Sequence, residues 1–240
     1  MSLRDKNMIQ RKFQATQYFG VLMQLLRDRS SFMEEIRQGV RLPSKIISLL
    51  VCSSIFFAFY GAIIGSSHSV LQALSSAFKL PCLYLMTLIL CLPTLYFFSI
   101  IFGSSRSIGQ YFAILMTCVA VISVLLFSLA PVTLFFMITA YNYQFFKLLN
   151  VFMFAITGFI GITFLYQGMQ SMSEPDKEGQ DTRTNILKFW LVLYALVGCQ
   201  LGWTLRPFFG SAGEFEVFRG MQGNFYLDIV KAIGEILGFN

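Results

Sequence analysis

The strongest constraint in this sequence is a long stretch without acidic residues. Between Ile46 and Ser173 there is no Asp or Glu, and the only cations are Lys79, Arg106 and Lys147. These cations separate four long apolar runs and do not interrupt them. Because a charge at the centre of a bilayer costs about 3 kcal/mol on insertion scales, such runs are typical of segments that lie in lipid. The sequence therefore predicts a protein that crosses a membrane several times.

The composition agrees with a membrane protein. Hydrophobic residues make up 56% of the chain and charged residues 12%, whereas soluble domains are about 25% charged. The apolar run after Pro131 either extends the third span past a kink or lies at the membrane interface. The predicted fold is all-α, a polytopic transmembrane bundle of about five helices. Its spans, each near the ~20 residues that a bilayer requires, are placed at 46–65, 80–102, 109–130, 148–169 and 187–205.

The distribution of Lys and Arg predicts the orientation. Of the 18 cations in the chain, nine precede the first span. With that tail inside, the inner side carries thirteen and the outer side five. The positive-inside rule then places the N-terminus in the cytoplasm. An odd number of spans places the C-terminus across the membrane.

The chain divides into an N-terminal tail (1–45), the bundle (46–205) and a C-terminal tail (206–240). Residues 14–41 predict an amphipathic helix, since apolar residues recur there at spacings of three and four. Three positions are open for this helix: on the cytoplasmic leaflet, on a partner protein, or packed on its own loops next to the membrane. The candidate contacts for lipid or a partner are the basic residues of this helix and the lysine just before the first span: Arg27, Arg29, Arg37, Arg41 and Lys45.

A second amphipathic helix is expected over residues 224–237, with Asn224 as its N-cap. It would lie on the outer leaflet or cap the bundle. At the end of the fifth span, Trp203, Arg206 and Phe208 have the residue types of membrane-interface anchors.

Proline and glycine are the notable residues within the spans. Pro93 lies in the middle of the second span, where it predicts either a kink or a break that lines a substrate path, and Pro131 predicts a kink in the third. Gly158 and Gly161 predict close packing of the fourth span against another helix. The Ser and Thr residues of the spans are expected to bond to carbonyls of their own helices.

Few residues point to chemistry. His68 is the only histidine and lies in a Ser-rich loop, and the five cysteines lack metal-type or paired spacing. No metalloprotease, phosphate-loop or dinucleotide motif is present. We therefore expect no catalytic, metal or cofactor-binding residues, no enzymatic activity and no nucleic-acid partner.

Three phrases carry a resemblance to a known group: the run KLPCLYLMTLILCLPTLYFF, the segment GWTLRPFFGS and the tail that begins NFY. They resemble uncharacterised bacterial multipass proteins, some from oxygenic photosynthetic bacteria. Some of these proteins are called actin-binding WH2 domain-containing proteins, a label that does not fit here because Leu26-Arg27-Asp28-Arg29 lacks the basic WH2 tetrapeptide. The layout also resembles the Yip1-type superfamily, which implies five spans, a cytoplasmic N-terminus and a translocated C-terminus.

These observations favour a non-enzymatic integral membrane protein. It would be a scaffold, an accessory subunit of a membrane complex, or an organiser of the membrane. The alternative is a permease or channel component for a small neutral or lipid-like substrate, although the missing intramembrane charges weaken it. Expected partners are the bilayer and either another membrane protein or further copies of this chain. The expected location is the plasma membrane of a bacterium, or a thylakoid membrane through the resemblance.

Overall fold

The computed structural model describes residues 17–67, 69–101, 106–139, 143–172, 180–205 and 208. Every regular element in these ranges is an α-helix, which confirms the predicted all-α fold. A first helix covers residues 17–27. The remaining helices are α2 (Arg29–Arg37), α3 (Leu42–Ser66), α4 (Val70–Ile101), α5 (Ile108–Thr139), α6 (Tyr143–Met172) and α7 (Gln180–Thr204).

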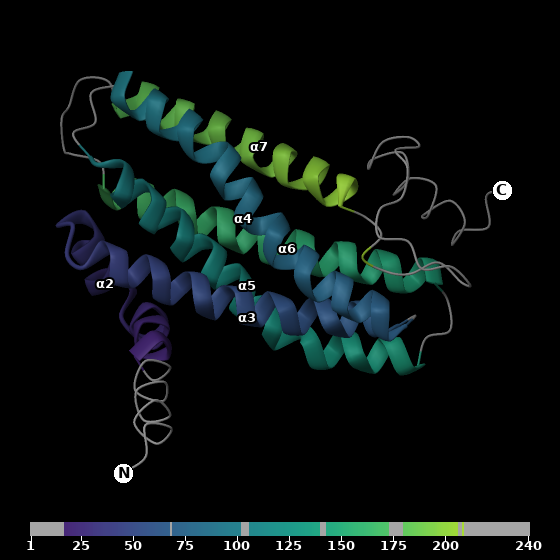
Figure 1. Cartoon of the computed structure of the whole chain (residues 1–240). Coiled ribbons are helices and arrows are strands. Elements are labelled where there is room, and N and C mark those ends of the chain that lie inside the picture. Colours follow the sequence, from purple (N-terminus) through teal and green to yellow (C-terminus); the bar gives the residue numbers. More distant parts are fainter. Residues whose placement is uncertain are drawn as a thin grey trace, which may run out of the picture.

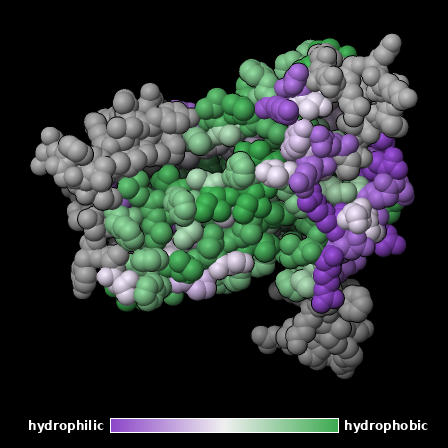
Figure 2. Space-filling model, turned by 180° about the vertical axis from the view of Figure 1, so that it is seen from behind, coloured by the Kyte–Doolittle hydropathy of each residue, from purple (hydrophilic) through white to green (hydrophobic). Residues whose placement is uncertain are grey.

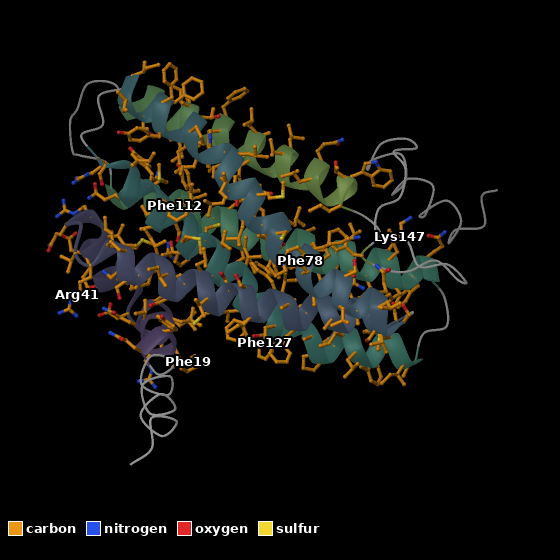
Figure 3. The ribbon with its side chains drawn as sticks, viewed as in Figure 1. Phe19, Arg41, Phe78, Phe112, Phe127 and Lys147 are labelled. Atoms are coloured by element: carbon orange, nitrogen blue, oxygen red, sulfur yellow. The ribbon has the colours of Figure 1, made fainter. Side chains whose placement is uncertain are left out.

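Five of these helices, α3 to α7, are long and apolar enough to cross a membrane, as the sequence predicts. They run side by side in alternating directions (Figure 1). The N-terminal helices and the end of α7 therefore lie at opposite ends of the bundle. Figure 3 shows Arg41 at the first end and Lys147 at the other, with carbon-rich side chains between them.

The beginning of the second span differs from the prediction. The sequence predicts that the second span begins at residue 80, but α4 begins at Val70, and both Pro81 and Pro93 lie inside the helix. Lys79, expected at the end of a span, is only 5% exposed. The residues before Lys79 are polar enough to resemble a loop. They are helical because Gln72 and Ser76 are buried, with Ser76 close against α3.

The helix α5 continues through Pro131 to Thr139, which decides between the two predicted positions of the run after that proline. Pro131 is exposed on the helix surface. Both α4 and α5 contain 32 residues, which corresponds to a length of about 48 Å. Since the hydrocarbon core of a bilayer is about 30 Å thick, these two helices must tilt or extend beyond it.

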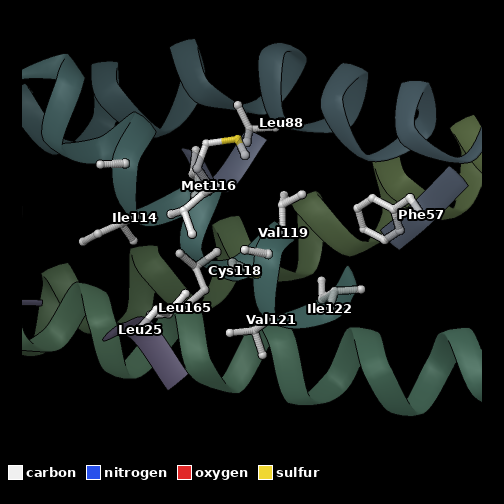
Figure 4. Close-up of a cluster of buried hydrophobic side chains, with 14 of the residues drawn as sticks. Leu25, Phe57, Leu88, Ile114, Met116, Cys118, Val119, Val121, Ile122 and Leu165 are labelled. Atoms are coloured by element: carbon white, nitrogen blue, oxygen red, sulfur yellow. The ribbon is translucent and has the colours of Figure 1, made fainter. Parts of the chain in front are cut away.

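The helix α5 forms the centre of the bundle. In the most apolar stretch of α5, 67% of the residues are buried, whereas the corresponding share is 22–39% in the other four long helices. Figure 4 shows side chains of α5, among them Ile114, Val119 and Ile122, in the middle of the buried cluster. The other long helices direct large apolar side chains outward. The surface seen in Figure 2 is accordingly hydrophobic over most of the bundle, and its hydrophilic side chains gather at the α2 end.

The N-terminal segment contains two helices, not the single helix expected over residues 14–41. The chain leaves helical geometry at Asp28, which has φ −134° and ψ 77°. The Asp28 side chain accepts a hydrogen bond from the backbone N–H of Ser31 and so caps α2. This break turns residues 17–27 away from the long helices (Figure 1). The predicted C-terminal helix over 224–237 lies outside the described residues.

Candidate functional site

The apolar face of α2 packs on the bundle. Phe32, Met33 and Ile36 of α2 are buried, as are Leu22 and Leu25 of the preceding helix. Met33 lies against Gly168 of α6. None of the three predicted positions describes this arrangement fully, because α2 packs on the long helices α5 and α6 of its own chain and not on loops. The buried apolar residues of α2 are therefore not available to insert into lipid, whereas Leu26 of the preceding helix is 48% exposed.

The C-terminal end of α2 is held by α5. The side-chain amide of Gln110 donates hydrogen bonds to the carbonyl oxygens of Arg37 (2.7 Å) and Ile36 (3.2 Å). These carbonyls belong to the last turn of α2, where donors from the helix itself run out, and that of Ile36 also accepts a hydrogen bond from the Gly39 N–H at 3.0 Å. Gly39 at φ +76° and Arg41 at φ +51° then reverse the chain before α3 begins at Leu42. Gln110 and this turn fix α2 against the end of the bundle.

Lys45 joins α3 to α2. Its ammonium group lies 2.6 Å from a carboxylate oxygen of Glu35 and 4.9 Å from the centre of the Phe32 ring. Gln24 donates to the other Glu35 oxygen at 3.0 Å. The hydrogen bond from Lys45 is the main cause that lowers the pKa of Glu35. Since Lys45 is only 4% exposed, it is not the lipid or partner contact that the sequence predicts.

A second ion pair on α2 faces solvent. Arg37 donates to both carboxylate oxygens of Glu34, at 2.6 and 2.7 Å. Gln38 donates to the same carboxylate at 2.7 Å. The hydrogen bond from Arg37 is the largest cause that lowers the pKa of Glu34 to about 2. The Glu34 carboxylate is thus ionised and already engaged within its own helix.

A cleft of about 440 Å³ separates the start of α2 from the end of α6. Residues 27–30, Met33 and Glu34 line one side, and Gln167 and Gly168 line the other. The Arg29 guanidinium lies 4.0 Å from the centre of the Phe164 ring and donates to the Phe164 carbonyl oxygen at 3.4 Å. Burial lowers the pKa of Arg29. We take this basic cleft as the candidate functional site.

The structure separates the other interface candidates. Arg27, Arg37 and Arg41 are exposed at the α2 end, as an interfacial role requires. Trp203 is 7% exposed and so packs inside the protein, not against lipid. Phe208 is also buried, and its carbonyl oxygen accepts a hydrogen bond from Ser76 Oγ at 2.7 Å. Arg206 lies outside the described residues.

The residues predicted to kink a helix or to pack it closely also differ in their surroundings. Pro93 and Pro131 are exposed on α4 and α5, so neither lines an interior path. Gly158 faces open space, and the close packing predicted for it is wrong. Gly161 does pack closely: a Cβ there would collide with the Ile122 side chain and lie 3.4 Å from Cys118 Sγ. Of the two glycines, only Gly161 therefore lies against α5.

The closest helix contact was missed in the sequence, although a signal for it exists. Gly61 and Gly65 form a strict small-xxx-small pattern in α3. A Cβ at Gly61 would meet the backbone of Ser76 and lie 3.1 Å from Ala77 Cα, and one at Gly65 would lie 2.7 Å from Ala73 Cα. Because the atoms in the way belong to the α4 backbone, only glycine allows this approach.

A buried polar cluster was also missed. Tyr60 Oη lies 3.0 Å from Asn150 Oδ1, to which it donates, and 3.2 Å from Thr133 Oγ1. The Asn150 amide donates to the Phe146 carbonyl oxygen at 2.8 Å. All three side chains are fully buried, and they come from α3, α5 and α6. Nothing in the local sequence pairs these residues, because they meet only through the packing of three helices.

Many other hydroxyl groups of the spans bond within their own helices, as predicted. Thr87 donates to the Leu83 carbonyl oxygen and Ser99 to that of Leu95, each at 2.7 Å. Thr163 donates to the Phe159 carbonyl oxygen at 2.9 Å. These bonds satisfy the hydroxyls without a water-filled path.

Among the described residues no group of three or more His, Cys, Asp and Glu side chains could hold a metal ion. His68 lies outside those residues. No protein-family model matches the chain, and neither a curated protein nor a solved structure is significantly similar to it.

Proposed function

We propose that this integral membrane protein is a non-catalytic scaffold, either an accessory subunit of a membrane complex or an organiser of the membrane. The observation that carries the proposal is the filled centre of the bundle. The side chains of α5 from Ala113 to Ala120 are all buried, and all but Thr117 and Cys118 are purely apolar. A helix enclosed in this way leaves no polar surface along which a solute could move.

The outer surface supports the same role. It carries large apolar side chains on two faces that α5 does not cover. The members on α4 and α7 include Phe97, Ile101, Phe189, Val192 and Leu196, and those on α6 include Phe152, Phe159 and Ile160. Such faces contact lipid tails or other transmembrane helices equally well, because packing and not hydrophobicity drives helix association in a bilayer.

Native gel electrophoresis and chemical cross-linking of membranes solubilised in a mild detergent test this proposal. We expect the 27.3 kDa chain to migrate in a larger, reproducible assembly that contains either copies of itself or one defined membrane protein. A monodisperse monomer with no cross-linked neighbour would contradict a scaffold.

The permease alternative predicts a different result. Purified protein in liposomes would conduct a small neutral solute, and Pro93→Ala would change the rate. We expect no flux above that of empty liposomes, because Pro93 is exposed on α4. Solute flux that depends on Pro93 would replace the scaffold by a transporter.

We also propose that the α2 end of the bundle is cytoplasmic, because the predicted inner side carries thirteen of the 18 cations. Reporter fusions test this orientation. A tag before Met1 should report the cytoplasm and a tag after Asn240 the opposite compartment. Reporters that place both ends in one compartment would contradict the five-span topology.

A further inference from the structure

The cleft between α2 and α6 is lined by two cations, Arg27 and Arg29, and neither forms an ion pair with the described residues. Arg29 uses the face of its guanidinium and one N–H on Phe164, which leaves its other N–H groups free to donate. The cleft is thus a cationic pocket with donors arranged for an anion.

The two carboxylates that line the cleft offset this charge only in part. One Asp28 carboxylate oxygen accepts hydrogen bonds from Ser30 Oγ (3.0 Å) and from the Ser31 N–H (3.1 Å). The Glu34 carboxylate forms the ion pair with Arg37 and accepts from Gln38. The Asp28 carboxylate keeps its negative charge because its donors are neutral, whereas the charge of Glu34 is offset by Arg37. Three cations (Arg27, Arg29 and Arg37) against two carboxylates leave an excess of one positive charge, which an incoming anion meets at the guanidinium groups of Arg27 and Arg29.

The position of the cleft distinguishes a lipid from a soluble anion. Gln167 lies in the last turn of the candidate membrane span of α6, Gln144–Gln170. Earlier in α6, apolar side chains recur every four residues and are exposed: Phe152, Ile156 and Ile160. Side chains four residues apart share one face of a helix, so an apolar track leads along α6 to the cleft. This arrangement fits a molecule with an anionic head and an acyl chain.

We propose that the cleft between α2 and α6 binds the phosphate group of an anionic phospholipid, with Arg27 and Arg29 as the phosphate ligands and the exposed face of α6 against one acyl chain. Arginine suits this role because its planar fork matches phosphate oxygens in a bidentate manner. The bound lipid would join the docked α2 to α6, whichever partner the bundle has.

Native mass spectrometry of the purified full chain, titrated with defined lipids in detergent, tests the site. We expect phosphatidylglycerol to bind at least about tenfold more tightly than phosphatidylcholine, because the choline cation offsets the phosphate charge of phosphatidylcholine and is repelled by Arg27 and Arg29. Arg29→Gln and Arg27→Gln should each weaken phosphatidylglycerol binding by up to about tenfold. Arg41→Gln removes the same charge from the same end of the bundle but outside the cleft, and should change binding by less than about twofold.

Two further variants keep the test independent of folding, since loss of Arg29 also removes its contact with Phe164. Gln167→Glu places a negative charge on the opposite wall at an exposed position, and should weaken phosphatidylglycerol binding without changing the unfolding temperature. Gln170→Glu is the matched control, because Gln170 is exposed one turn further on and does not line the cleft. A smaller loss of affinity is expected for Gln170→Glu.

A competition with inorganic phosphate separates a lipid from a free anion. Phosphate at millimolar concentration should not displace phosphatidylglycerol, because it lacks the acyl contact with α6. Displacement at that concentration would overturn the lipid assignment in favour of a soluble phosphate. Equal binding of phosphatidylcholine, or unchanged phosphatidylglycerol binding in Arg27→Gln, Arg29→Gln and Gln167→Glu, would overturn the site itself.

Discussion

The helices α5 and α7 are both apolar enough to cross a membrane, yet they have opposite surroundings. In the most apolar stretch of α5, 67% of the residues are buried, whereas in that of α7 only 22% are buried. Their hydropathies, 2.7 and 1.5, rank them in the same order. Hydropathy alone cannot give this result, because α4 at 2.0 is no more buried than α7. What separates interior from exterior is whether neighbouring helices approach closely enough to exclude lipid.

The contrast between interior and exterior can be tested with pairs of identical residues, one inside and one outside. The largest effect is expected at glycine. Gly61→Ala introduces a Cβ that meets the α4 backbone, so α3 and α4 must move apart. We expect a loss of about 3 kcal/mol in the free energy of unfolding.

The matched change is Gly158→Ala, where a Cβ meets nothing within 4 Å. It should be neutral or slightly stabilising, by up to about 0.5 kcal/mol, because alanine favours the helix. Denaturant unfolding in mixed micelles measures both variants. Equal stability of the two would show that the glycine contact does not hold α3 to α4.

A smaller effect is expected for leucine. Leu126 of α5 is fully buried, whereas Leu196 of α7 is 51% exposed. Leu126→Ala should cost about 2 kcal/mol, since it leaves a cavity in a packed interior. Leu196→Ala should cost less than about 0.5 kcal/mol, because lipid fills the space that the side chain leaves. The same micelle assay compares them, and a large loss at Leu196 would place a tight partner helix on α7.

The third pair compares hydroxyl groups. Tyr60→Phe removes the hydrogen bonds to Asn150 and Thr133, which join three helices. We expect a loss of about 1 kcal/mol, the usual range for an interhelical hydrogen bond in a membrane. Thr163→Val removes a bond within α6 only and should change stability by less than about 0.5 kcal/mol. Thermal unfolding in detergent distinguishes the two, and equal effects would mean that the cluster adds nothing to helix association.

The smallest effect is expected at the α2 end of the bundle. Glu35 forms an ion pair there with Lys45 of α3, and Glu34 forms an exposed one with Arg37 of the same helix. The pKa of Glu35 is lowered chiefly by its hydrogen bond from Lys45. A lowered carboxyl pKa means that the stabilisation is present above the unfolded pKa of about 4.3 and is lost as the pH falls through the folded value. Docking of α2 should therefore weaken as the pH falls below about 4.

Limited pepsin digestion between pH 5 and pH 3 measures this docking. Glu35→Gln should be cleaved near Asp28 faster than the wild type at pH 5, and the difference should shrink as the pH falls and the wild-type carboxylate is protonated. Glu34→Gln should behave as the wild type at pH 5, because an exposed ion pair contributes little. If Glu35→Gln is as resistant as the wild type throughout, the buried pair does not hold α2.

The number of long helices was predictable, because it depends on where apolar residues lie along the chain. Five apolar runs predicted five helices, since a bilayer leaves few other ways to satisfy the backbone. Boundaries were less accurate where a polar residue is buried by a neighbouring helix. Gln72, Ser76 and Lys79 resemble a loop before the second span, yet they belong to α4.

The candidate site was predictable only in its composition. Arg27 and Arg29 were candidates because they are basic and precede a span, but Lys45 was a candidate for the same reason and is buried against Glu35. The break in the helix at Asp28 explains why Arg27 and Arg29 differ from Lys45 in their surroundings. It directs Arg27 and Arg29 toward α6 and forms the cleft, and a period of 3.6 residues cannot reveal such a break.

By itself the sequence determined that this chain forms apolar helices with a basic segment at one end. That result follows from hydrophobicity and charge, which act residue by residue. Only the tertiary structure decided which helix is central, which glycines allow backbones to touch and which polar side chains meet. Those outcomes depend on distances between residues far apart in the chain, such as Gly61 and Ser76 or Tyr60 and Asn150. Close packing of rigid helices sets those distances, and packing depends on the shapes of several helices at once.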